Sequence, residues 1–288
     1  MAAALKIAYL NGEFCAIDSL RIPVLDRGFL FGDAVYEVVP VYQGMPFRNH
    51  QHYLRLSRSL QQIQMAAVMD FARWEALVKQ LIERNSGGTM AIYAQVSRGA
   101  DNGRNHIINN DLAPTVFAMA TPMTNRSPEA LSRGLRVITR EDTRWGRCDI
   151  KSTSLLANIL LYSEANALDA QECLLHRNGI LTEGSTSSVF IVRDGKVYAP
   201  PYSYGILPGT TRDLVAELCE ANNTPVSLAQ ITMEELGLAD EIWLASSTRE
   251  LLPVTRLDKA PVGDGHPGPL WRVIDSAFQQ YKAEQING

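Results

Sequence analysis

Residues 172–199 read ECLLHRNGILTEGSTSSVFIVRDGKVYA, and this stretch decides the fold class of the chain. Short apolar runs alternate in it with the dipeptides Asn178-Gly179 and Asp194-Gly195, which suit the tight turns of β-hairpins. We expect four short strands, at residues 172–175, 180–182, 188–192 and 197–199. Because such short turns join antiparallel strands, this part of the chain favours an antiparallel or mixed sheet over a doubly wound parallel one.

Helical patterns flank this stretch on both sides. Apolar residues recur every three or four positions in residues 50–64 and 71–84, and we also expect helices at 155–170, 211–222 and 270–283. Further strands are expected at residues 7–10, 13–17, 34–42, 90–96, 115–119, 135–139 and 241–245. Helices and strands are mixed without a strict alternation, which predicts an α+β fold with helices flanking mixed or antiparallel sheets.

The length of 288 residues allows one large domain or two modest ones. The segment TPMTNRS at residues 121–127 has turn-forming residues and no periodicity, which is typical of a linker. We therefore predict an N-terminal α/β domain at residues 1–121, a linker at 122–130 and a C-terminal domain at 131–288.

The composition excludes several classes of protein. Lys and Arg number 27 against 31 Asp and Glu, so the basic excess of a nucleic-acid or membrane-surface binder is missing. No apolar run approaches the roughly 20 residues of a membrane span. The four cysteines form no CxxC pair and the five histidines are scattered, so we expect no metal site and a reducing, cytoplasmic location.

Two segments rich in hydroxyl groups are candidates for a phosphate site. In ILPGTTRD, residues 206–213, a turn leads into a helix, and backbone N–H groups with Thr210 and Thr211 could bind an anion there. The alternative is ordinary capping of the helix by threonine. Ser246 and Ser247 follow an expected strand, where they would either line a site or form a polar turn.

Lys151 and Glu183 are the candidate reactive groups. Lys151 precedes an expected helix among small hydroxyl residues, where partial burial would lower its pKa and allow an imine with a carbonyl cofactor. Glu183 lies in a turn rich in Gly and Ser, and could face a buried cation. Each residue could equally be a solvated charge. Together an amine, an acid and a phosphate cup are what pyridoxal 5′-phosphate requires.

Five motifs in a fixed order carry a resemblance to a known family. They are DRGFLFGDAVYEV at 26–38, HYLRL at 52–56, RCDIKS at 147–152, LHRNGILTEGS at 175–185 and GILPGTTR at 205–212. In this order they resemble the fold-type IV pyridoxal-phosphate enzymes, and among these the bacterial D-amino-acid aminotransferases. The resemblance implies two domains, the second of which binds the cofactor, with the cofactor in the cleft between them.

The resemblance also implies roles for individual residues. Lys151 matches the lysine that holds the cofactor as a Schiff base and moves the proton, and Glu183 matches the acid at the pyridine nitrogen. Leu207 matches a residue packed on the cofactor ring, and His52 matches a family histidine near the cofactor. The positions that match the phosphate ligands are Arg55, Thr210, Thr211, Ser246 and Ser247.

Substrate recognition is expected at Tyr36, Arg104 and His106, which match a tyrosine and an Arg-x-His loop that grip the substrate α-carboxylate. In the family this loop comes from the partner subunit, so a homodimer is implied. The implied reaction is ping-pong transfer of an amino group between amino acids and 2-oxo acids, with D-alanine and 2-oxoglutarate as the expected pair. The alternative for the loop at residues 97–111 is a plain polar surface.

Three other functions stay open on the sequence. A branched-chain L-amino-acid aminotransferase of the same fold is the first, and the Arg104-x-His106 pair argues against it. An (R)-amine transaminase or an aminodeoxychorismate lyase would use the same lysine. A phosphate-ligand binding protein without catalysis would use residues 209–211 and form no imine.

Overall fold

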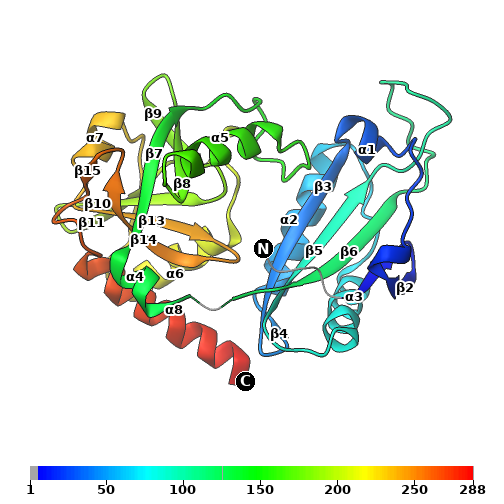
Figure 1. The fold of residues 1–288 in the computed structure, drawn as a ribbon, viewed down its shortest axis with the longest axis horizontal. Coiled ribbons are helices and arrows are strands. Elements are labelled where there is room, and N and C mark those ends of the chain that lie inside the picture. Colours follow the sequence, from blue (N-terminus) through cyan, green and yellow to red (C-terminus); the bar gives the residue numbers. More distant parts are fainter. Residues whose placement is uncertain (1–5, 125, 288) are drawn as a thin grey trace. The chain divides into compact units, whose positions relative to one another are not determined.

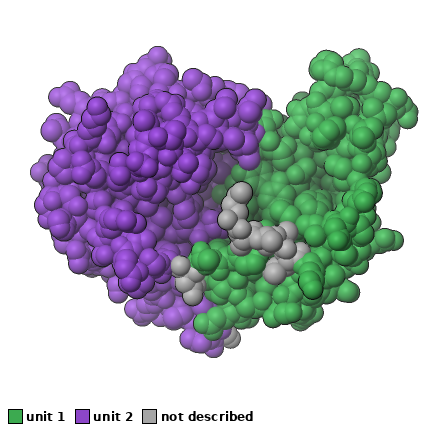
Figure 2. Space-filling view, in the orientation of Figure 1, with its two compact units in different colours: residues 1–124, 150–154 green, residues 125–149, 155–288 purple. Residues whose placement is uncertain are grey.

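A computed structural model describes residues 6–124 and 126–287, and they divide into two compact units (Figures 1 and 2). The first unit contains Met1–Thr124 and Ile150–Ser154, and the second contains Asn125–Asp149 and Leu155–Gly288. The α+β class expected from the sequence is confirmed, with antiparallel and mixed sheets in the two units. Residues 1–5, 125 and 288 of the predicted domains and linker lie outside the described residues.

The first unit is built on a six-stranded antiparallel sheet with the order β2-β1-β6-β5-β3-β4. Its strands are β1 (Ile7–Leu10), β2 (Glu13–Ala16), β3 (Ala34–Tyr42), β4 (Met45–Pro46), β5 (Met90–Ser97) and β6 (Thr115–Pro122). Two helices, α2 (Asn49–Gln62) and α3 (Phe71–Arg84), pack on the sheet, α2 against β3 and α3 against β1 and β6. The apolar stripe of each helix closes a core around Trp74, Leu81 and Ile92.

The second unit is built on a nine-stranded mixed sheet. Its main path is β12-β11-β10-β13-β14-β7-β8-β9, and β15 pairs with β14. The strands are β7 (Leu135–Glu141), β8 (Glu172–Arg177), β9 (Ile180–Gly184), β10 (Ser188–Arg193), β11 (Lys196–Ala199), β12 (Val226–Leu228), β13 (Glu241–Ser246), β14 (Glu250–Leu257) and β15 (Ala260–Pro261). The helices are α4 (Pro128–Arg133), α5 (Leu156–Ala167), α6 (Thr210–Ala221), α7 (Met233–Gly237) and α8 (Pro269–Asn287).

Helices α5 and α6 pack on different strands of this sheet. Helix α5 packs against β7 and β8, while α6 packs against β13 and β14, with α8 beside it. Asn178 and Gly179, and likewise Asp194 and Gly195, have positive φ angles, as the tight turns predicted from the sequence require. The hairpins β8–β9 and β10–β11 therefore form at the positions predicted from the sequence.

The structure adds local detail at three places. The Gly/Asp-rich stretch at residues 26–33 holds a short helix, α1 (Arg27–Phe31), whose first turn is capped by the Asp26 carboxylate accepting from the Gly28 N–H at 2.8 Å. The interval 122–130, predicted as a linker, includes the start of helix α4, which Ser127 caps. Ile150–Ser154, which lie within the predicted C-terminal domain, belong to the first unit.

Candidate active site

The segment Ile150–Ser154 positions Lys151 beside strand β3. The Tyr36 N–H donates to the Lys151 carbonyl at 2.9 Å, and the Lys151 N–H donates to the Ser59 hydroxyl on α2 at 3.3 Å. The Lys151 Nζ lies 4.2 Å from the centre of the Tyr36 ring. Within the described residues, no carboxylate forms an ion pair with this Nζ. The half-buried amine is therefore held over an aromatic face without a counter-ion.

A buried charge cluster lies on the neighbouring elements of the first unit. Glu37 on β3 is fully buried, and Arg55 on α2 donates to its two carboxylate oxygens from Nε at 2.7 Å and from Nη2 at 2.8 Å. The His52 Nδ1 lies 2.8 Å from Glu37 Oε2. Arg55 is one helical turn from Ser59, so the predicted phosphate-binding arginine lies on the part of α2 that faces Lys151.

Burial and ion pairing shift the pKa values of this cluster in opposite directions. Burial alone would raise the pKa of Glu37, but Arg55 and His52 hold that pKa well below its usual range. Burial lowers the pKa of His52, although the Glu37 carboxylate opposes the shift. Glu37 is therefore an anion that neutralises part of the Arg55 charge, and the pKa of His52 lies below its ordinary value.

In the second unit, Glu183 on β9 is buried against an arginine that sequence reasoning missed. Arg144 Nη1 donates to Glu183 Oε1 at 2.6 Å, and the Leu207 N–H donates to Oε2 at 3.1 Å. Two other N–H groups of Arg144 donate to Asp142, at 2.9 and 3.0 Å. Burial raises the pKa of Glu183, although Arg144 opposes the shift. Predicted residues Glu183 and Leu207 are thus directly joined.

The predicted phosphate residues of the second unit converge at the start of α6. Gly209 is the N-cap residue and offers no side-chain cap, and a Cβ placed on it would stand 2.7 Å from Ser188 Oγ. Ser188 pairs with Ala245 in the β10–β13 ladder, and Ser246 is the next residue. The start of α6, at Thr210 and Thr211, is therefore close to the turn that carries Ser246 and Ser247. A helix N-terminus with hydroxyl groups beside it can bind a phosphate.

The predicted substrate residues form two groups within the first unit. The Tyr36 ring stacks on Tyr93, with ring centres 5.5 Å apart. Arg104 and His106 instead lie against Phe31 of α1, the guanidinium carbon 5.1 Å and the imidazole centre 5.2 Å from its ring centre. Within the described residues, no hydrogen bond or ring contact joins Arg104 or His106 to Tyr36 or Lys151.

Arg27 of α1 is a second arginine that the sequence did not single out. Its Nη1 donates to the carbonyl of Asn105 at 2.6 Å, and its Nε donates to Asp33 at 2.8 Å. Asn105 is the middle residue of the Arg-x-His sequence, and all three residues of that sequence are exposed. Helix α1 therefore fixes the loop while its Arg and His side chains stay accessible within the chain.

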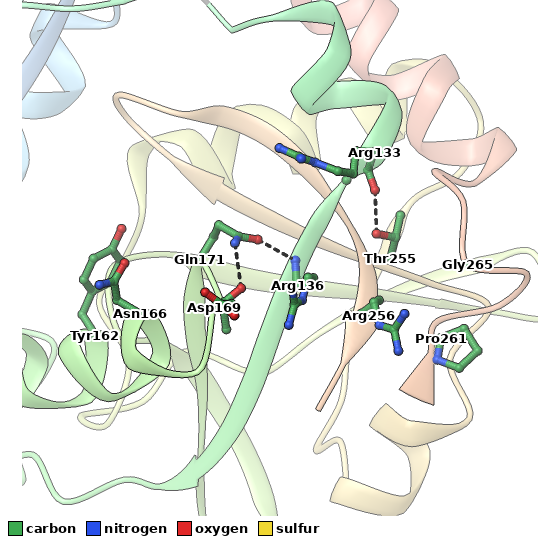
Figure 3. Close-up of a pocket in the computed structure, with 12 residues that line it drawn as sticks. Arg133, Arg136, Tyr162, Asn166, Asp169, Gln171, Thr255, Arg256, Pro261 and Gly265 are labelled. Atoms are coloured by element: carbon green, nitrogen blue, oxygen red, sulfur yellow. Dashed lines mark hydrogen bonds between the residues drawn. The ribbon is translucent and has the colours of Figure 1, made fainter. Parts of the chain in front are cut away.

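A separate groove of about 590 Å³ lies elsewhere on the second unit, and Figure 3 shows it. Its walls include Arg133, Arg136 and Arg256, and Gln171 donates from its amide to the Asp169 carbonyl at 3.0 Å and accepts from the Arg136 N–H at 2.9 Å. None of the predicted site residues lines this groove. Among the described residues, no group of three His, Cys, Asp or Glu side chains could hold a metal ion.

Comparisons with known proteins define the family. The model of the family "Amino-transferase class IV" matches residues 34–257, which is more than half of the chain. The chain belongs to this family, whose members have fold type IV and work with pyridoxal 5′-phosphate.

Named relatives cover almost the whole chain. A D-alanine aminotransferase of Staphylococcus aureus (strain COL) is 35% identical over 95% of this chain and 96% of its own length. A D-alanine aminotransferase of Bacillus licheniformis is 36% identical over 93% of this chain and 94% of its own length.

Solved structures with the same fold include branched-chain amino acid aminotransferases. The Escherichia coli enzyme superposes with a TM-score of 0.87 at 26% identity, covering 96% of this chain and 94% of its own. The enzyme from T.th., solved with pyridoxamine 5′-phosphate, superposes with a TM-score of 0.88 at 26% identity, covering 97% of this chain and 94% of its own.

Proposed function

We propose that this aminotransferase moves the amino group of a D-amino acid, with D-alanine as the first candidate, to a 2-oxo acid such as 2-oxoglutarate. The observation that carries the proposal is the Lys151 amine, which is half-buried over the Tyr36 ring and has no carboxylate partner among the described residues. An uncompensated amine of this kind is suited to act as a nucleophile and a base. The relatives named D-alanine aminotransferase support the choice of substrate.

The residues present fit pyridoxal 5′-phosphate. In the second unit, the N-terminus of α6 with Thr210, Thr211, Ser246 and Ser247 would supply donors for a phosphate. In the first unit, Arg55 is the predicted phosphate-binding cation. Glu183 supplies a buried carboxylate that is incompletely compensated, which suits a protonated ring nitrogen. When bound, the cofactor supplies an electron-accepting ring that stabilises negative charge at the substrate Cα.

Each reactive residue then has a defined task. The Nζ of Lys151 takes the proton from the substrate Cα and returns a proton later in the reaction. Glu183 keeps a proton at the cofactor ring nitrogen, and Arg144 and the Leu207 N–H hold the Glu183 carboxylate in place. Leu207, whose N–H is joined to Glu183, would pack on the cofactor ring.

Tyr36, Arg104 and His106 recognise the substrate carboxylate in this proposal. A guanidinium and an imidazole are good carboxylate donors, and the exposure of both side chains leaves them available to a second copy of the chain. Helix α5 supports such a homodimer, since Leu156, Ile159 and Leu160 are 70%, 58% and 61% exposed on one face of the helix. We therefore propose a homodimer in which each subunit completes the substrate site of the other.

The proposed place of action is the cytoplasm. The four cysteines are free thiols, which is the form that a reducing compartment maintains. None of the described helices combines the length and the apolar character needed to cross a membrane.

Initial rates test the function directly. The wild-type enzyme with added cofactor is assayed with 2-oxoglutarate as acceptor and D-alanine, L-leucine or an (R)-amine as donor. A separate reaction follows release of pyruvate from aminodeoxychorismate. We expect D-alanine to give the highest kcat/KM. A higher value with L-leucine would identify a branched-chain aminotransferase, the activity named in the structural neighbours.

A matched pair of lysine variants makes this test specific. We expect Lys151→Ala to lose transamination, while Lys79→Ala, a change at an exposed lysine on α3 in the same unit, keeps it. Equal rates for Lys151→Ala and the wild type would contradict the proposal.

A further inference from the structure

Glu172, the first residue of β8, is a fully buried carboxylate that has no task in the proposed reaction. It accepts hydrogen bonds from three successive hydroxyl groups, those of Ser185, of Thr186 at 2.5 Å and of Ser187 at 3.1 Å. Arg249 Nη2 donates to the same carboxylate at 2.5 Å. Burying a carboxylate is costly unless it is paired, so this many partners indicates a site built around the charge.

The first set of partners forms the tight turn between β9 and β10. The Gly184 N–H donates to the Ser187 carbonyl at 2.7 Å, and a Cβ on Gly184 would stand 2.3 Å from Ser187 Oγ and 3.4 Å from Glu172 Cδ. The turn is therefore folded closely over the carboxylate. Glu183, the proposed partner of the cofactor ring, immediately precedes Gly184.

The other partner, Arg249, belongs to the turn between β13 and β14. Arg249 also donates to the Gln171 carbonyl at 3.2 Å and to the Thr186 hydroxyl at 3.0 Å. Its turn carries Ser246 and Ser247, for whose hydroxyl groups no protein partner is present among the described residues. A single carboxylate thus ties together the two turns that flank the start of α6.

We propose that Glu172 is a positioning residue for the phosphate of the cofactor. It holds the turn at residues 184–187 directly and the turn at 246–249 through Arg249, so that the Ser246 and Ser247 hydroxyls and the N-terminus of α6 face one phosphate. This inference rests on the proposed function, because it takes the phosphate to be that of pyridoxal 5′-phosphate. A preorganised donor set of this kind strengthens binding by removing the cost of ordering the donors.

The test compares ligands that differ only in the phosphate. Dissociation constants of pyridoxal 5′-phosphate and pyridoxal are measured by absorption titration of the full-length wild type and of Glu172→Gln, which keeps the shape and removes the charge. We expect Glu172→Gln to raise the dissociation constant of pyridoxal 5′-phosphate about tenfold or more, which corresponds to about 1.4 kcal/mol. The dissociation constant of pyridoxal should change less than twofold.

A buried carboxylate at the opposite end of β13 from Ser246 serves as the control. Glu241 accepts N–H donors from Leu270 and Trp271 at 2.9 and 2.8 Å and is also buried. We expect Glu241→Gln to leave the ratio of the two dissociation constants unchanged, even if it lowers stability. If Glu172→Gln does not fold, Arg249→Met breaks the same link from the half-exposed partner and is expected to give the same loss.

The possible outcomes separate the two proposals. Equal weakening of both ligands, or no weakening of either, would overturn the positioning role of Glu172. If the wild type bound pyridoxal 5′-phosphate no more tightly than pyridoxal, the proposed phosphate site at the start of α6 would itself be overturned. Transamination by the wild type together with an unchanged ligand ratio in Glu172→Gln would leave the proposed function intact and remove only this inference.

Discussion

Glu37 and Glu183 are two buried carboxylates that each face an arginine, yet their pKa values shift in opposite directions. Burial raises the pKa of both, but for Glu37 the charge of Arg55 and the contact with His52 more than reverse the effect. For Glu183 burial prevails over Arg144. Glu37 accepts two N–H groups from Arg55 and contacts His52, whereas Glu183 accepts one N–H from Arg144 and one from Leu207. The negative charge of Asp142 also adds to the rise in the pKa of Glu183.

Glu37 therefore has a structural role, whereas the Glu183 carboxylate can still accept a hydrogen bond from a ligand. Glu37 is already saturated by protein donors, so it stabilises the fold and neutralises part of the Arg55 charge. The arginine beside Glu183 shares its other N–H groups with Asp142, so the Glu183 carboxylate can gain from a further positive donor. A protonated ring nitrogen is the donor that the proposed function supplies.

The largest expected effect is on stability at Glu37. Glu37→Gln removes the buried carboxylate charge that pairs with Arg55, so we expect the free energy of unfolding to fall by about 3–5 kcal/mol. Urea denaturation of the enzyme without cofactor measures this loss. Glu83→Gln, an exposed change on α3, is the control and should alter stability by less than about 0.5 kcal/mol. Equal stability of Glu37→Gln and wild type would contradict the saturated ion pair.

The second effect is on catalysis at Glu183. Glu183→Gln cannot keep the cofactor ring nitrogen protonated, so we expect kcat to fall about 10²–10³-fold, as when one preorganised electrostatic contact is removed. The readout is the steady-state rate with D-alanine and 2-oxoglutarate at saturating cofactor. The control Glu220→Gln, an exposed change on α6, should keep the wild-type rate. Full activity of Glu183→Gln would remove Glu183 from the reaction.

The pH dependence of stability should separate the two carboxylates by sign. The pKa of Glu37 is lowered in the folded protein. The ionised Glu37 therefore stabilises the fold when the pH is above the pKa of about 4.3 in the unfolded chain, and this stabilisation is lost as the pH falls below it. The pKa of Glu183 is raised, so its contribution is present below about 4.3 and is lost as pH rises through the folded value.

Unfolding measured from pH 3 to pH 7 on the cofactor-free variants gives the readout. The destabilisation by Glu37→Gln should shrink toward acid pH, whereas Glu183→Gln should become more stable relative to wild type as pH rises. The same pH trend in both variants would contradict the assigned directions.

The smallest expected effect concerns the substrate loop. Phe31→Leu removes the ring that packs against Arg104 and His106, so we expect KM for D-alanine to rise about fivefold, corresponding to about 1 kcal/mol, with a smaller change in kcat. Phe29→Leu changes a ring on the same helix that is 71% exposed, and it should leave KM unchanged. A rise in KM for both variants would point to the helix itself rather than to the contact.

Local sequence signals predicted the elements that repeat a simple pattern. The strand Ile7–Leu10 and the helix Phe71–Arg84 have the predicted ends, because hairpin turns and an apolar stripe mark them. Helix α1 has only five residues, too few for a periodic pattern, and depends on the Asp26 cap and on Gly32 with φ 67°. Strand β14 was not predicted, and Pro253 inside it obscures the pattern.

In the candidate site too, some residues could be predicted from the sequence and others could not. The resemblance to a family assigned Lys151 and Glu183, whereas Arg144 could not be found, because its partner Glu183 lies 39 residues away along the chain. Glu37 and Glu172 lie in strands where a charged residue alone is more often exposed. Their burial depends on the tertiary partners Arg55 and Arg249, which cannot be predicted from a local sequence pattern.

The most direct test of the account is to trap the cofactor on the chain. The wild type is incubated with pyridoxal 5′-phosphate, reduced with borohydride and digested, and the peptides are examined by mass spectrometry. The account predicts one dominant phosphopyridoxyl adduct, on Lys151, that is lost when D-alanine is added before reduction. An adduct mainly on another lysine, or none at all, would contradict it.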